Sequence, residues 1–413
     1  MEYGLIGAKL GHSYSPQIHA QLGDYDYRLY EQTEQAFTAL LEGRAFKGLN
    51  VTIPYKVLAY RHCDALSDTA REVGCVNTLI VRPDGSLYGH NTDIGGFIAM
   101  ARRAGVEIAG KKAVILGSGG TSLTARTACR RLGAREIVVV SRGGPVDYEA
   151  LYRDHADAQV LVNTTPVGMY PNNGGCAVDI ARLPMLTGVL DVIYNPAKTA
   201  LILDAEARGL PCAGGLYMLV GQAREAAELF TGKAIPETET DRIYRLLAGE
   251  MLNLVLIGMP GCGKTSVGRA LARELNRSFI DMDEEIVRRA GRSIPEIFRD
   301  DGEAAFRRME AEIIAETGRE KGRVIATGGG AVLRADNVRA LRQNGRLLLL
   351  ERRLDALSMD GRPLSKSLPA LEQMWLEREP LYRAAADAAI DNNAAPGEAV
   401  ARAREAFYEA VDR

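Results

Sequence analysis

The 413-residue chain lacks several features that would place it in a special class of protein. Its 51 basic and 53 acidic residues nearly balance, so it has no basic excess of the kind that binding to nucleic acid or to an anionic membrane normally requires. Its six cysteines are widely spaced and show no paired ligand pattern, so neither a disulfide framework nor a zinc site is indicated.

Long apolar runs are also absent. The longest, such as the four leucines at 347–350, fall far short of a membrane span. The first residues, MEYGLIGAKLGHS, contain no apolar segment of signal-peptide length, so we expect a cytoplasmic protein. A chain of this length should form two to three domains, because a single hydrophobic core rarely grows beyond about 250–300 residues.

The chain does contain short β-branched segments that alternate with helical ones. Predicted strands are GLNVTI (48–53), KAVILG (112–117), EIVVVS (136–141), VLDVIYN (189–195) and LNLVLIG (252–258). Helical patterns lie at 121–132, 199–208 and 216–230. This alternation predicts an α/β fold with parallel sheets.

Two changes in the pattern predict domain boundaries. The polar segment 231–250 follows a helix and precedes a fresh apolar strand, so it is the predicted linker region. A second boundary is expected near residue 100. The resulting domains are 1–100, completed by helices around 214–240, then 101–213, and finally 251–413.

A glycine-rich turn, GSGG, directly follows one predicted strand and precedes a helix. Its glycines, Gly117, Gly119 and Gly120, would let the main chain approach a pyrophosphate at the helix N-terminus, although an ordinary tight turn has the same form. The next strand ends at Ser141 and Arg142, where an enzyme that uses NAD would normally carry an acidic residue. An arginine here suits a 2′-phosphate and favours NADP, the alternative being a solvated loop arginine.

Polar side chains gather in short motifs within the first 100 residues. GHSYSP carries Ser13 and Ser15, NVTIPYK carries Asn50, Thr52 and Lys56, VNT carries Asn77, and NTD carries Asn91, Thr92 and Asp93. Each motif alone is typical of a turn or a helix cap. Together their hydroxyl and amide groups suit a small polyhydroxylated acid. A lysine brought beside an aspartate would supply the proton for a carbonyl that is reduced by hydride.

These motifs, with GSGGTS, NTTPVGM, DVIYNP and GGLYMLVGQA further along, resemble the shikimate dehydrogenase family over about 1–240. The resemblance implies an α/β substrate domain and a Rossmann domain that binds NADP(H). It also implies that Lys56, oriented by Asp93, acts as general acid toward the 3-keto oxygen of 3-dehydroshikimate.

The same resemblance implies binding roles for further residues. Ser13 and Ser15 would hold the substrate carboxylate. The ring hydroxyls would be bound by Thr52, Asn77, Asp93 and Gln222, with Tyr194 nearby. The cofactor would be bound by Gly117, Ser118, Gly119, Gly120, Ser141, Arg142, Thr164, Met169 and Gly215.

A second phosphate-binding motif, GMPGCGKT, begins at Gly258 and ends at Thr265. It has the spacing G-x-x-x-x-G-K-[ST] and lies between a predicted strand and a helix, as a P-loop requires. The backbone amides of such a loop point at the phosphates of ATP, Lys264 reaches the β- and γ-phosphates, and the Thr265 hydroxyl ligates Mg²⁺.

Charged residues beyond this loop suggest an acceptor site. Asp281 and Asp283 are two residues apart at a predicted strand end, so one could reach Mg²⁺ while the other takes the proton of the acceptor hydroxyl. Arg307 and Arg378 could converge on a carboxylate, although each alone is typical of a helix surface. Arg362 lies in a polar stretch that could close over ATP as a lid.

The P-loop, FIDMDEEI, GRSIPEIF, DGEAAFRRME, GGGAV, GRPL and REPLYR are together similar to the shikimate kinase family over about 251–400. The similarity implies a P-loop kinase domain with a parallel sheet, in which Asp283 binds the shikimate 3-hydroxyl and serves as base. The substrate carboxylate would be held by Arg307 and Arg378, with Gly328, Gly329 and Gly330. ATP would be bound by Gly261, Cys262, Gly263, Lys264, Thr265, Ser266 and Arg362, and Mg²⁺ by Thr265 and Asp281.

The two resemblances indicate one bifunctional enzyme of the shikimate pathway with small-molecule partners, using NADP(H), ATP and Mg²⁺. The product of the first half would be the substrate of the second. A quinate/shikimate dehydrogenase fused to a kinase for another small metabolite is one alternative. A ligand sensor with one inactive half is another. Neither nucleic acid nor a membrane is expected as a partner, and both a monomer and a homodimer remain open.

Overall fold

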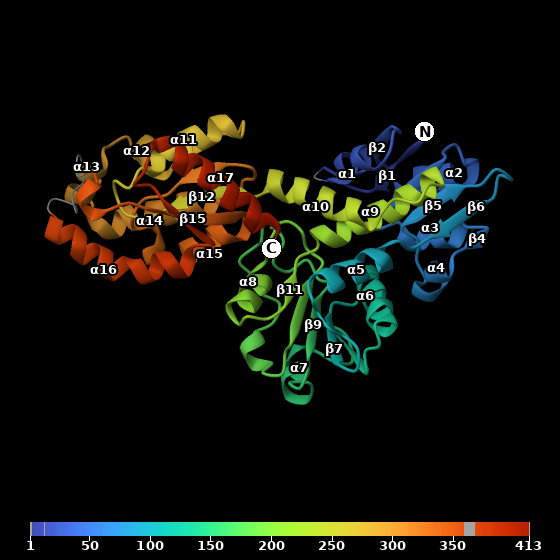
Figure 1. The fold of residues 1–413 in the computed structure, drawn as a ribbon. Helices are drawn as coiled ribbons and strands as arrows, with labels where there is room; N and C mark the ends of the chain where they lie inside the picture. Colours follow the sequence, from blue (N-terminus) through green and yellow to red (C-terminus); the bar gives the residue numbers. More distant parts are fainter. Residues whose placement is uncertain (1, 12, 359–367, 413) are drawn as a thin grey trace. The chain divides into compact units, whose positions relative to one another are not determined.

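A computed structural model describes residues 2–11, 13–358 and 368–412 of the chain (Figure 1). The chain forms two compact units. Unit 1 contains Met1–Asn195 and Thr199–Tyr244, and unit 2 contains Pro196–Lys198 and Arg245–Arg413. The α/β class predicted from the sequence is confirmed, because helices and strands alternate along both units.

Unit 1 begins with a six-stranded sheet of order β2-β1-β3-β5-β6-β4. Strand β1 is parallel to both of its neighbours, β2 and β3, whereas β5 runs antiparallel to β3 and β6. A core that includes Ile6, Phe37, Leu49 and Leu79 lies between this sheet and its helices. The strands are β1 (Tyr3–Gly7), β2 (Tyr27–Glu31), β3 (Gly48–Val51), β4 (Ala65–Leu66), β5 (Thr78–Val81) and β6 (Leu87–His90), and the helices are α1 (Ser15–Leu22), α2 (Glu34–Gly43), α3 (Lys56–His62) and α4 (Asp68–Val73).

The second sheet of unit 1 has five parallel strands in the order β11-β10-β9-β7-β8. Every residue of β7, which lies between β9 and β8, is buried, as expected for a parallel strand with helices on both faces. Val114 packs with one core and Ile115 with the other. The elements are α5 (Asp93–Arg103), β7 (Lys112–Leu116), α6 (Gly120–Arg131), β8 (Glu136–Val140), α7 (Tyr148–Asp154), β9 (Val160–Asn163), η1 (Ile180–Arg182), β10 (Gly188–Asp191), α8 (Ala200–Ala207) and β11 (Cys212–Ala213).

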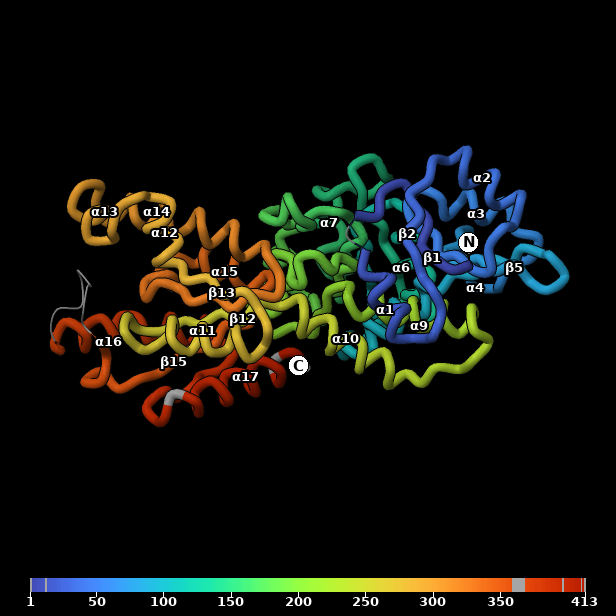
Figure 2. The backbone as a smooth tube through the Cα atoms, turned by 90° about the horizontal axis from the view of Figure 1, so that it is seen from above, coloured from blue at the N-terminus to red at the C-terminus, as the bar shows by residue number. Residues whose placement is uncertain are grey.

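Helix α9 (Leu216–Thr231) links the two sheets of unit 1. It packs along α5, and it also lies beside α1, although α1 and α9 are far apart in sequence (Figure 2). Ala226 and Phe230 share a core with Leu5 and Tyr27 of the first sheet. This helix therefore completes the layer over the first sheet.

Unit 2 is built on a five-stranded parallel sheet of order β13-β14-β12-β15-β16. Its strands are β12 (Asn253–Ile257), β13 (Phe279–Asp281), β14 (Val324–Ala326), β15 (Gly345–Glu351) and β16 (Ala388–Asp391). Its helices are α11 (Lys264–Glu274), α12 (Met282–Ala290), α13 (Ile294–Asp300), α14 (Gly302–Thr317), η2 (Ala331–Leu333), α15 (Ala335–Asn344), η3 (Leu354–Ala356), α16 (Leu368–Ala385) and α17 (Pro396–Asp412).

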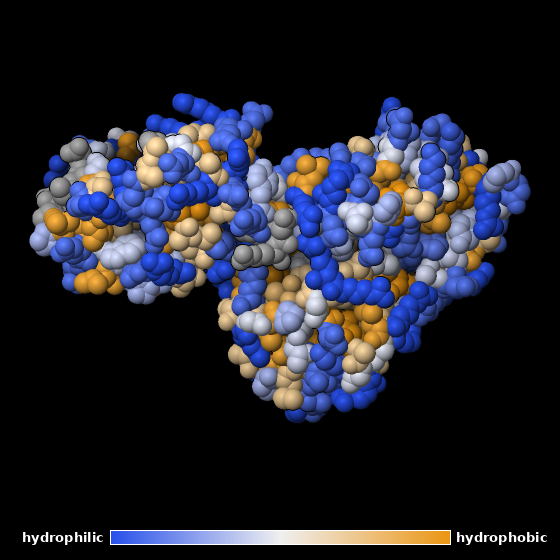
Figure 3. Space-filling view, viewed as in Figure 1, coloured by the Kyte–Doolittle hydropathy of each residue, from blue (hydrophilic) through white to orange (hydrophobic). Residues whose placement is uncertain are grey.

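Residues 231–250, the predicted linker, are mostly helical. They contain the end of α9 and most of helix α10 (Glu237–Met251), whose two ends belong to different units. On the face drawn in Figure 3, hydrophilic side chains cover most of each unit, with apolar ones in smaller groups between them. Among the helices of the described residues, none is both long and apolar enough to cross a membrane.

Candidate functional sites

The first site is centred on an ion pair between Lys56 and Asp93 in unit 1. Lys56 begins α3 and Asp93 begins α5, and Lys56 Nζ donates to Asp93 Oδ2 at 2.6 Å. Burial alone would lower the pKa of the Lys56 ammonium, but the charge and hydrogen bond of Asp93 outweigh it, so this pKa is raised. The lysine is therefore protonated at neutral pH.

The other oxygen of Asp93 accepts a hydrogen bond from Asn77, which belongs to a network of amide and hydroxyl groups. Asn77 Nδ2 donates to Asp93 Oδ1 and to Thr92 Oγ1, both at 2.9 Å, and the Thr92 main-chain N–H donates to Asn77 Oδ1 at 2.8 Å. Gln222 of α9 joins this network through Oε1, which lies 3.4 Å from Asn77 Nδ2. The predicted residues Lys56, Asn77, Asp93 and Gln222 are thus brought together, and their network fixes the orientation of the carboxylate.

The remaining predicted substrate residues lie at the ends of neighbouring elements. Ser13 Oγ and Ser15 Oγ are 3.1 Å apart at the start of α1. Tyr194 packs edge-on against Tyr14, with the ring centroids 6.2 Å apart. Thr52 directly follows β3 and is partly buried. No described contact links Ser13 or Thr52 to Lys56, so their roles in binding the substrate stay predictions.

Two asparagines that the sequence placed among the substrate-facing groups are structural instead. Asn50 accepts a hydrogen bond from Tyr27 Oη at 2.7 Å and donates to Thr78 Oγ1 at 3.0 Å. Asn91 is fully buried and donates to the Cys75 carbonyl oxygen at 3.2 Å. Both side chains are therefore bonded to other parts of the fold, although Asn91 Oδ1 has no partner among the described residues.

The glycine-rich turn of unit 1 is open at the N-terminus of α6. Gly117 has φ 103°, and a Cβ there would lie 3.0 Å from Thr164 Oγ1, so a side chain would be strained and crowded. Gly119 and Gly120 face open space, and no side chain caps the helix. The free amides of such a terminus can bind a phosphate.

The other predicted cofactor residues are spread around that turn. Ser118, Arg142 and Met169 are exposed, and Ser141 and Thr164 are partly buried. Because β7 and β8 are parallel neighbours, the turn and Arg142 lie at the same edge of the sheet. Gly215 is buried against the Val192 main chain, where a side chain would clash, so close packing is what this position visibly requires.

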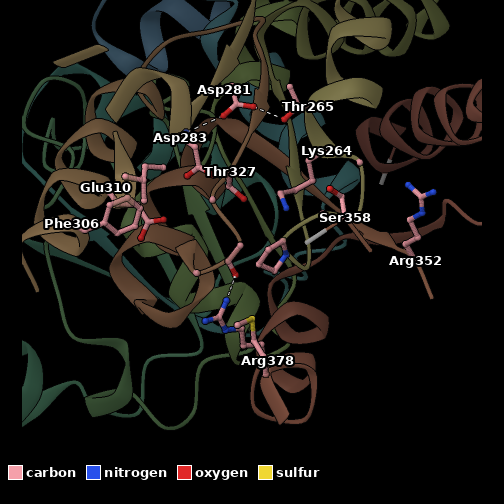
Figure 4. A pocket seen from close by; sticks show the side chains of 18 of the residues that line it. Lys264, Thr265, Asp281, Asp283, Phe306, Glu310, Thr327, Arg352, Ser358 and Arg378 are labelled. Carbon is pink, nitrogen blue, oxygen red and sulfur yellow. Dashed lines mark hydrogen bonds between the residues drawn. The ribbon is translucent and has the colours of Figure 1, made fainter. Parts of the chain in front are cut away.

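The second site is a cavity of about 480 Å³ in unit 2 (Figure 4). It is lined by residues from the P-loop, the strand ends and helices α14 and α16. Among the predicted site residues, those lining it are Gly261, Gly263, Lys264, Thr265, Ser266, Asp281, Asp283, Arg307, Gly328, Gly329, Gly330 and Arg378. Cys262 is fully buried and does not line it, and Arg362 lies outside the described residues.

The P-loop has the conformation that its glycines permit. Gly258 has φ 140° and its Cβ position would lie 2.6 Å from the Leu350 carbonyl oxygen, so only glycine fits. Lys264 Nζ donates to the carbonyl oxygens of Gly258 and Met259, each at 2.9 Å. The lysine thus lies along the loop, at the position where phosphate oxygens would be bound.

Thr265 and Asp281 form a pair of hard oxygen donors. Thr265 Oγ1 donates to Asp281 Oδ2 at 2.6 Å, and Asp281 Oδ1 accepts from the main-chain N–H of Asp283 at 3.0 Å. Within the described residues, no group of three or more His, Cys, Asp or Glu side chains could hold a metal ion by itself. A hydroxyl and one carboxylate nevertheless fit Mg²⁺, which takes few protein ligands and completes its shell with water and phosphates.

Two arginines meet at the triglycine segment, where Arg378 Nη1 donates to the Gly329 carbonyl oxygen at 3.1 Å. The guanidinium of Arg307 lies directly against Gly330, at the position a Cβ would occupy. Arg378 is only 7% exposed. Both guanidinium groups therefore lie against one segment, in an arrangement suited to a carboxylate.

Glu310 is a residue of this site that the sequence analysis missed. It is 1% exposed, and Oε2 accepts from Arg307 Nη1 at 2.8 Å. A Cβ on Gly328 would lie 2.7 Å from Glu310 Oε1 and 2.8 Å from Asp283 Oδ1, so both carboxylates lie against that glycine. Burial raises the pKa of Glu310 against the opposing effect of Arg307, and the Asp283 charge adds to the rise. Glu310 follows Arg307 by three residues, a spacing that makes the two side chains neighbours on a helix, and this was the sequence signal that could have identified it.

Comparison with known proteins gives matches in both units. Residues 5–79 match the family model of the shikimate dehydrogenase substrate binding domain, and residues 260–408 match that of shikimate kinase. A shikimate dehydrogenase (NADP(+)) from Clostridium perfringens strain SM101 is 35% identical over 269 residues, which cover 59% of this chain and 97% of the relative.

Solved structures agree with this match. Shikimate dehydrogenase 1 from Peptoclostridium difficile is 36% identical with a TM-score of 0.54, covering 60% of this chain and 97% of that one. Shikimate 5-dehydrogenase from Listeria monocytogenes, solved in complex with shikimate and NAD, is 31% identical with a TM-score of 0.54. The match covers 60% of this chain and 96% of that one.

Proposed function

We propose a function for this chain from its family: the chain belongs to the shikimate dehydrogenase family through its N-terminal part, and its residues 260–408 match the shikimate kinase family. Unit 1 reduces 3-dehydroshikimate to shikimate with NADPH. Unit 2 phosphorylates shikimate to shikimate 3-phosphate with ATP and Mg²⁺. The product of the first reaction is the substrate of the second.

The observation that carries the dehydrogenase proposal is the Lys56–Asp93 pair, held by Asn77 and Gln222. NADPH, when bound at the Gly117–Gly120 turn, supplies the hydride. Lys56 donates a proton to the oxygen of the ketone as the hydroxyl forms, and solvent reprotonates the lysine afterwards. Asp93 orients the ammonium and stabilises its charged form before the transfer.

The substrate is proposed to be held by polar groups around that pair. Ser13 and Ser15 donate to its carboxylate, and Thr52, Asn77 and Gln222 bind its hydroxyls. Arg142 binds the 2′-phosphate that distinguishes NADP from NAD. The relative from Clostridium perfringens is named for NADP(+), and this supports the choice of cofactor.

The observation that carries the kinase proposal is the cavity that joins the P-loop to Asp283 and the two arginines. ATP with Mg²⁺ supplies the phosphoryl group when bound. Asp283 accepts the proton of the acceptor hydroxyl or positions that hydroxyl for attack. Arg307 and Arg378 hold the substrate carboxylate, and Lys264 stabilises charge on the phosphates.

A coupled assay tests both halves on one chain. Starting from 3-dehydroshikimate, NADPH and ATP, we expect NADPH oxidation followed by ADP release. The Lys264→Met variant should form shikimate and release no ADP, and the Lys56→Met variant should release ADP only when shikimate is added. A wild-type chain inactive in either step would reject the corresponding half of the proposal and the sensor alternative would replace it.

A further inference from the structure

We propose that unit 1 holds a second binding site, for a small organic monocarboxylate with a compact apolar body. The site is a cavity of about 320 Å³ among helices α5, α9 and α10. The residues that line it are Gly95, Ile98, Ala99, Arg102, Gly221, Arg224, Glu237 and Thr240. None of these residues has a role in the proposed reactions.

Two of the residues that line this cavity carry a buried polar atom without a hydrogen-bond partner among the described residues. Thr240 is 1% exposed, and its Oγ1 makes no hydrogen bond to any described residue. Arg224 Nε is also buried and unpaired within the described chain. Buried polar groups are nearly always hydrogen-bonded, because an unpaired one costs about 1–3 kcal/mol. An oxygen-bearing ligand between Thr240 and Arg224 would satisfy both.

The charges around the cavity favour a monoanion. Arg224 Nη1 already donates to Glu228 Oε1 at 3.0 Å and to the Ile235 carbonyl oxygen at 2.8 Å, so Glu228 offsets its charge. The Arg102 side chain is exposed, and no hydrogen bond or ion pair links its guanidinium to another described residue, so this group is available to a ligand. Glu237 also lines the cavity, and its carboxylate opposes a dianion such as phosphate more strongly than a monoanion. A single carboxylate therefore fits the charge and the fork geometry of arginine best.

The rest of the lining accepts an apolar body. Gly95 and Gly221 present no side chains, Ala99 presents a methyl group, and Ile98 is a partly buried aliphatic residue. The volume lies at the lower end of the range for small-molecule sites, roughly 300–1,000 Å³. A carboxylate on a single ring is of suitable size.

The cavity adjoins helices that carry residues of the Lys56–Asp93 site. Asp93 is the first residue of α5, and Gly221 directly precedes Gln222 on α9. Gly95 and Gly221 are close in sequence to these residues, but neither Asp93 nor Gln222 lines the cavity, so the two sites are distinct. Binding of a monocarboxylate in this cavity requires neither of the proposed reactions and is tested separately from them.

The test is a saturation-transfer NMR titration of the intact chain with benzoate. Saturating shikimate is included so that both proposed carboxylate-binding substrate sites are filled. We expect residual benzoate binding that Arg102→Gln weakens at least tenfold and that Ala99→Leu abolishes by filling the cavity. Arg135→Gln, which removes an exposed arginine outside the cavity, should leave it unchanged.

Further arms identify the ligand chemistry and guard against misfolding. Benzyl alcohol, which lacks the carboxylate, should not displace benzoate, and inorganic phosphate at the same concentration should not displace it either. All three variants should retain the dehydrogenase and kinase rates of the wild type. Loss of all benzoate binding upon addition of shikimate, equal binding by wild type and both cavity variants, or displacement by phosphate would overturn the proposal.

Discussion

Lys56 and Asp93 form a nearly buried ion pair, with Nζ 2.6 Å from Oδ2 and side chains 19% and 12% exposed. The two residues come from different helices and are joined by no local constraint, so only the fold brings them together. The pair keeps the lysine charged in a place where burial alone would favour its neutral form.

Replacing Lys56 by methionine should abolish proton donation without removing much side-chain volume. We expect the dehydrogenase kcat to fall by roughly 10²–10⁴-fold, the usual contribution of a general acid. The kinase rate of the same preparation should be unchanged. Lys47→Met, which alters an exposed lysine paired with Glu2, serves as control. An active Lys56→Met enzyme would exclude this lysine as the proton donor.

Replacing Thr265 tests the proposed Mg²⁺ site. Thr265→Val removes the hydroxyl that donates to Asp281 Oδ2, whereas Thr265→Ser retains it. We expect valine to lower the kinase kcat by about 10²-fold or more and to raise the Mg²⁺ concentration needed for half-maximal rate. Serine should restore most of the activity, and EDTA should stop the kinase step alone. Equal rates for both variants would argue against a metal role.

Arg378 should determine the affinity of the kinase for shikimate. Arg378→Gln removes a charge-assisted contact worth about 1.5–3 kcal/mol, which corresponds to a KM for shikimate raised roughly 10–100-fold. Arg383→Gln is the matched control, because Arg383 lies on the same helix but is exposed and paired with Glu379. Steady-state kinetics at saturating ATP measure the effect. A change in the KM for ATP alone would contradict the carboxylate role.

Arg142 should select NADPH over NADH. Its replacement by glutamine removes the proposed partner of the 2′-phosphate, so the KM for NADPH should rise about tenfold or more while the KM for NADH stays nearly constant. Arg153→Gln, on the exposed side of α7, provides the comparison. Equal rises in the KM for NADPH and the KM for NADH would show that Arg142 does not bind the 2′-phosphate.

Asp191 should make the stability of unit 1 depend on pH. Burial raises the pKa of this carboxyl from 3.8 to about 6, despite hydrogen bonds from Ile193, Thr199 and Asn163. Because the folded-state pKa is raised, its favourable contribution is complete below pH 3.8 and is lost as the pH rises through 6. Relative to Asp191→Asn, the wild type should therefore lose stability between pH 4 and pH 7, by at most about 3 kcal/mol.

Amide hydrogen exchange in β9 and β10 at matched pH would measure that difference. Asp154→Asn is the control, since Asp154 is exposed and its pKa is lowered mainly by Arg153. The difference in stability between the wild type and Asp154→Asn should not decline between pH 4 and pH 7. A wild-type advantage over Asp191→Asn that grows with pH would show that the carboxylate is stabilised when charged.

The sequence alone predicted the α/β class and the two glycine-rich turns between a strand and a helix. These features are local: a strand, a glycine turn and a helix follow one another directly, and the φ of 103° at Gly117 and 140° at Gly258 explain why glycine stands there. Family motifs likewise named most of the charged residues of both candidate sites, but not Glu310. The segment 231–250 was predicted as a linker from its polarity, and that polarity alone did not indicate that most of the segment forms helix α10.

What only the tertiary structure decided is which polar groups face a site and which serve the fold. Asn50 and Asn77 belong to similar motifs, yet Asn50 is bound to Tyr27 and Thr78 while Asn77 holds Asp93. Glu310 belongs to the second site because the fold brings Gly328 and Asp283, which come from other elements, close to its carboxylate. Local sequence therefore determined the loops and the chemistry available, because backbone conformation is set by neighbours in the chain. The long-range packing of α5, α9, α14 and α16 determined the partners, because a hydrogen bond depends on which atoms the fold brings within reach.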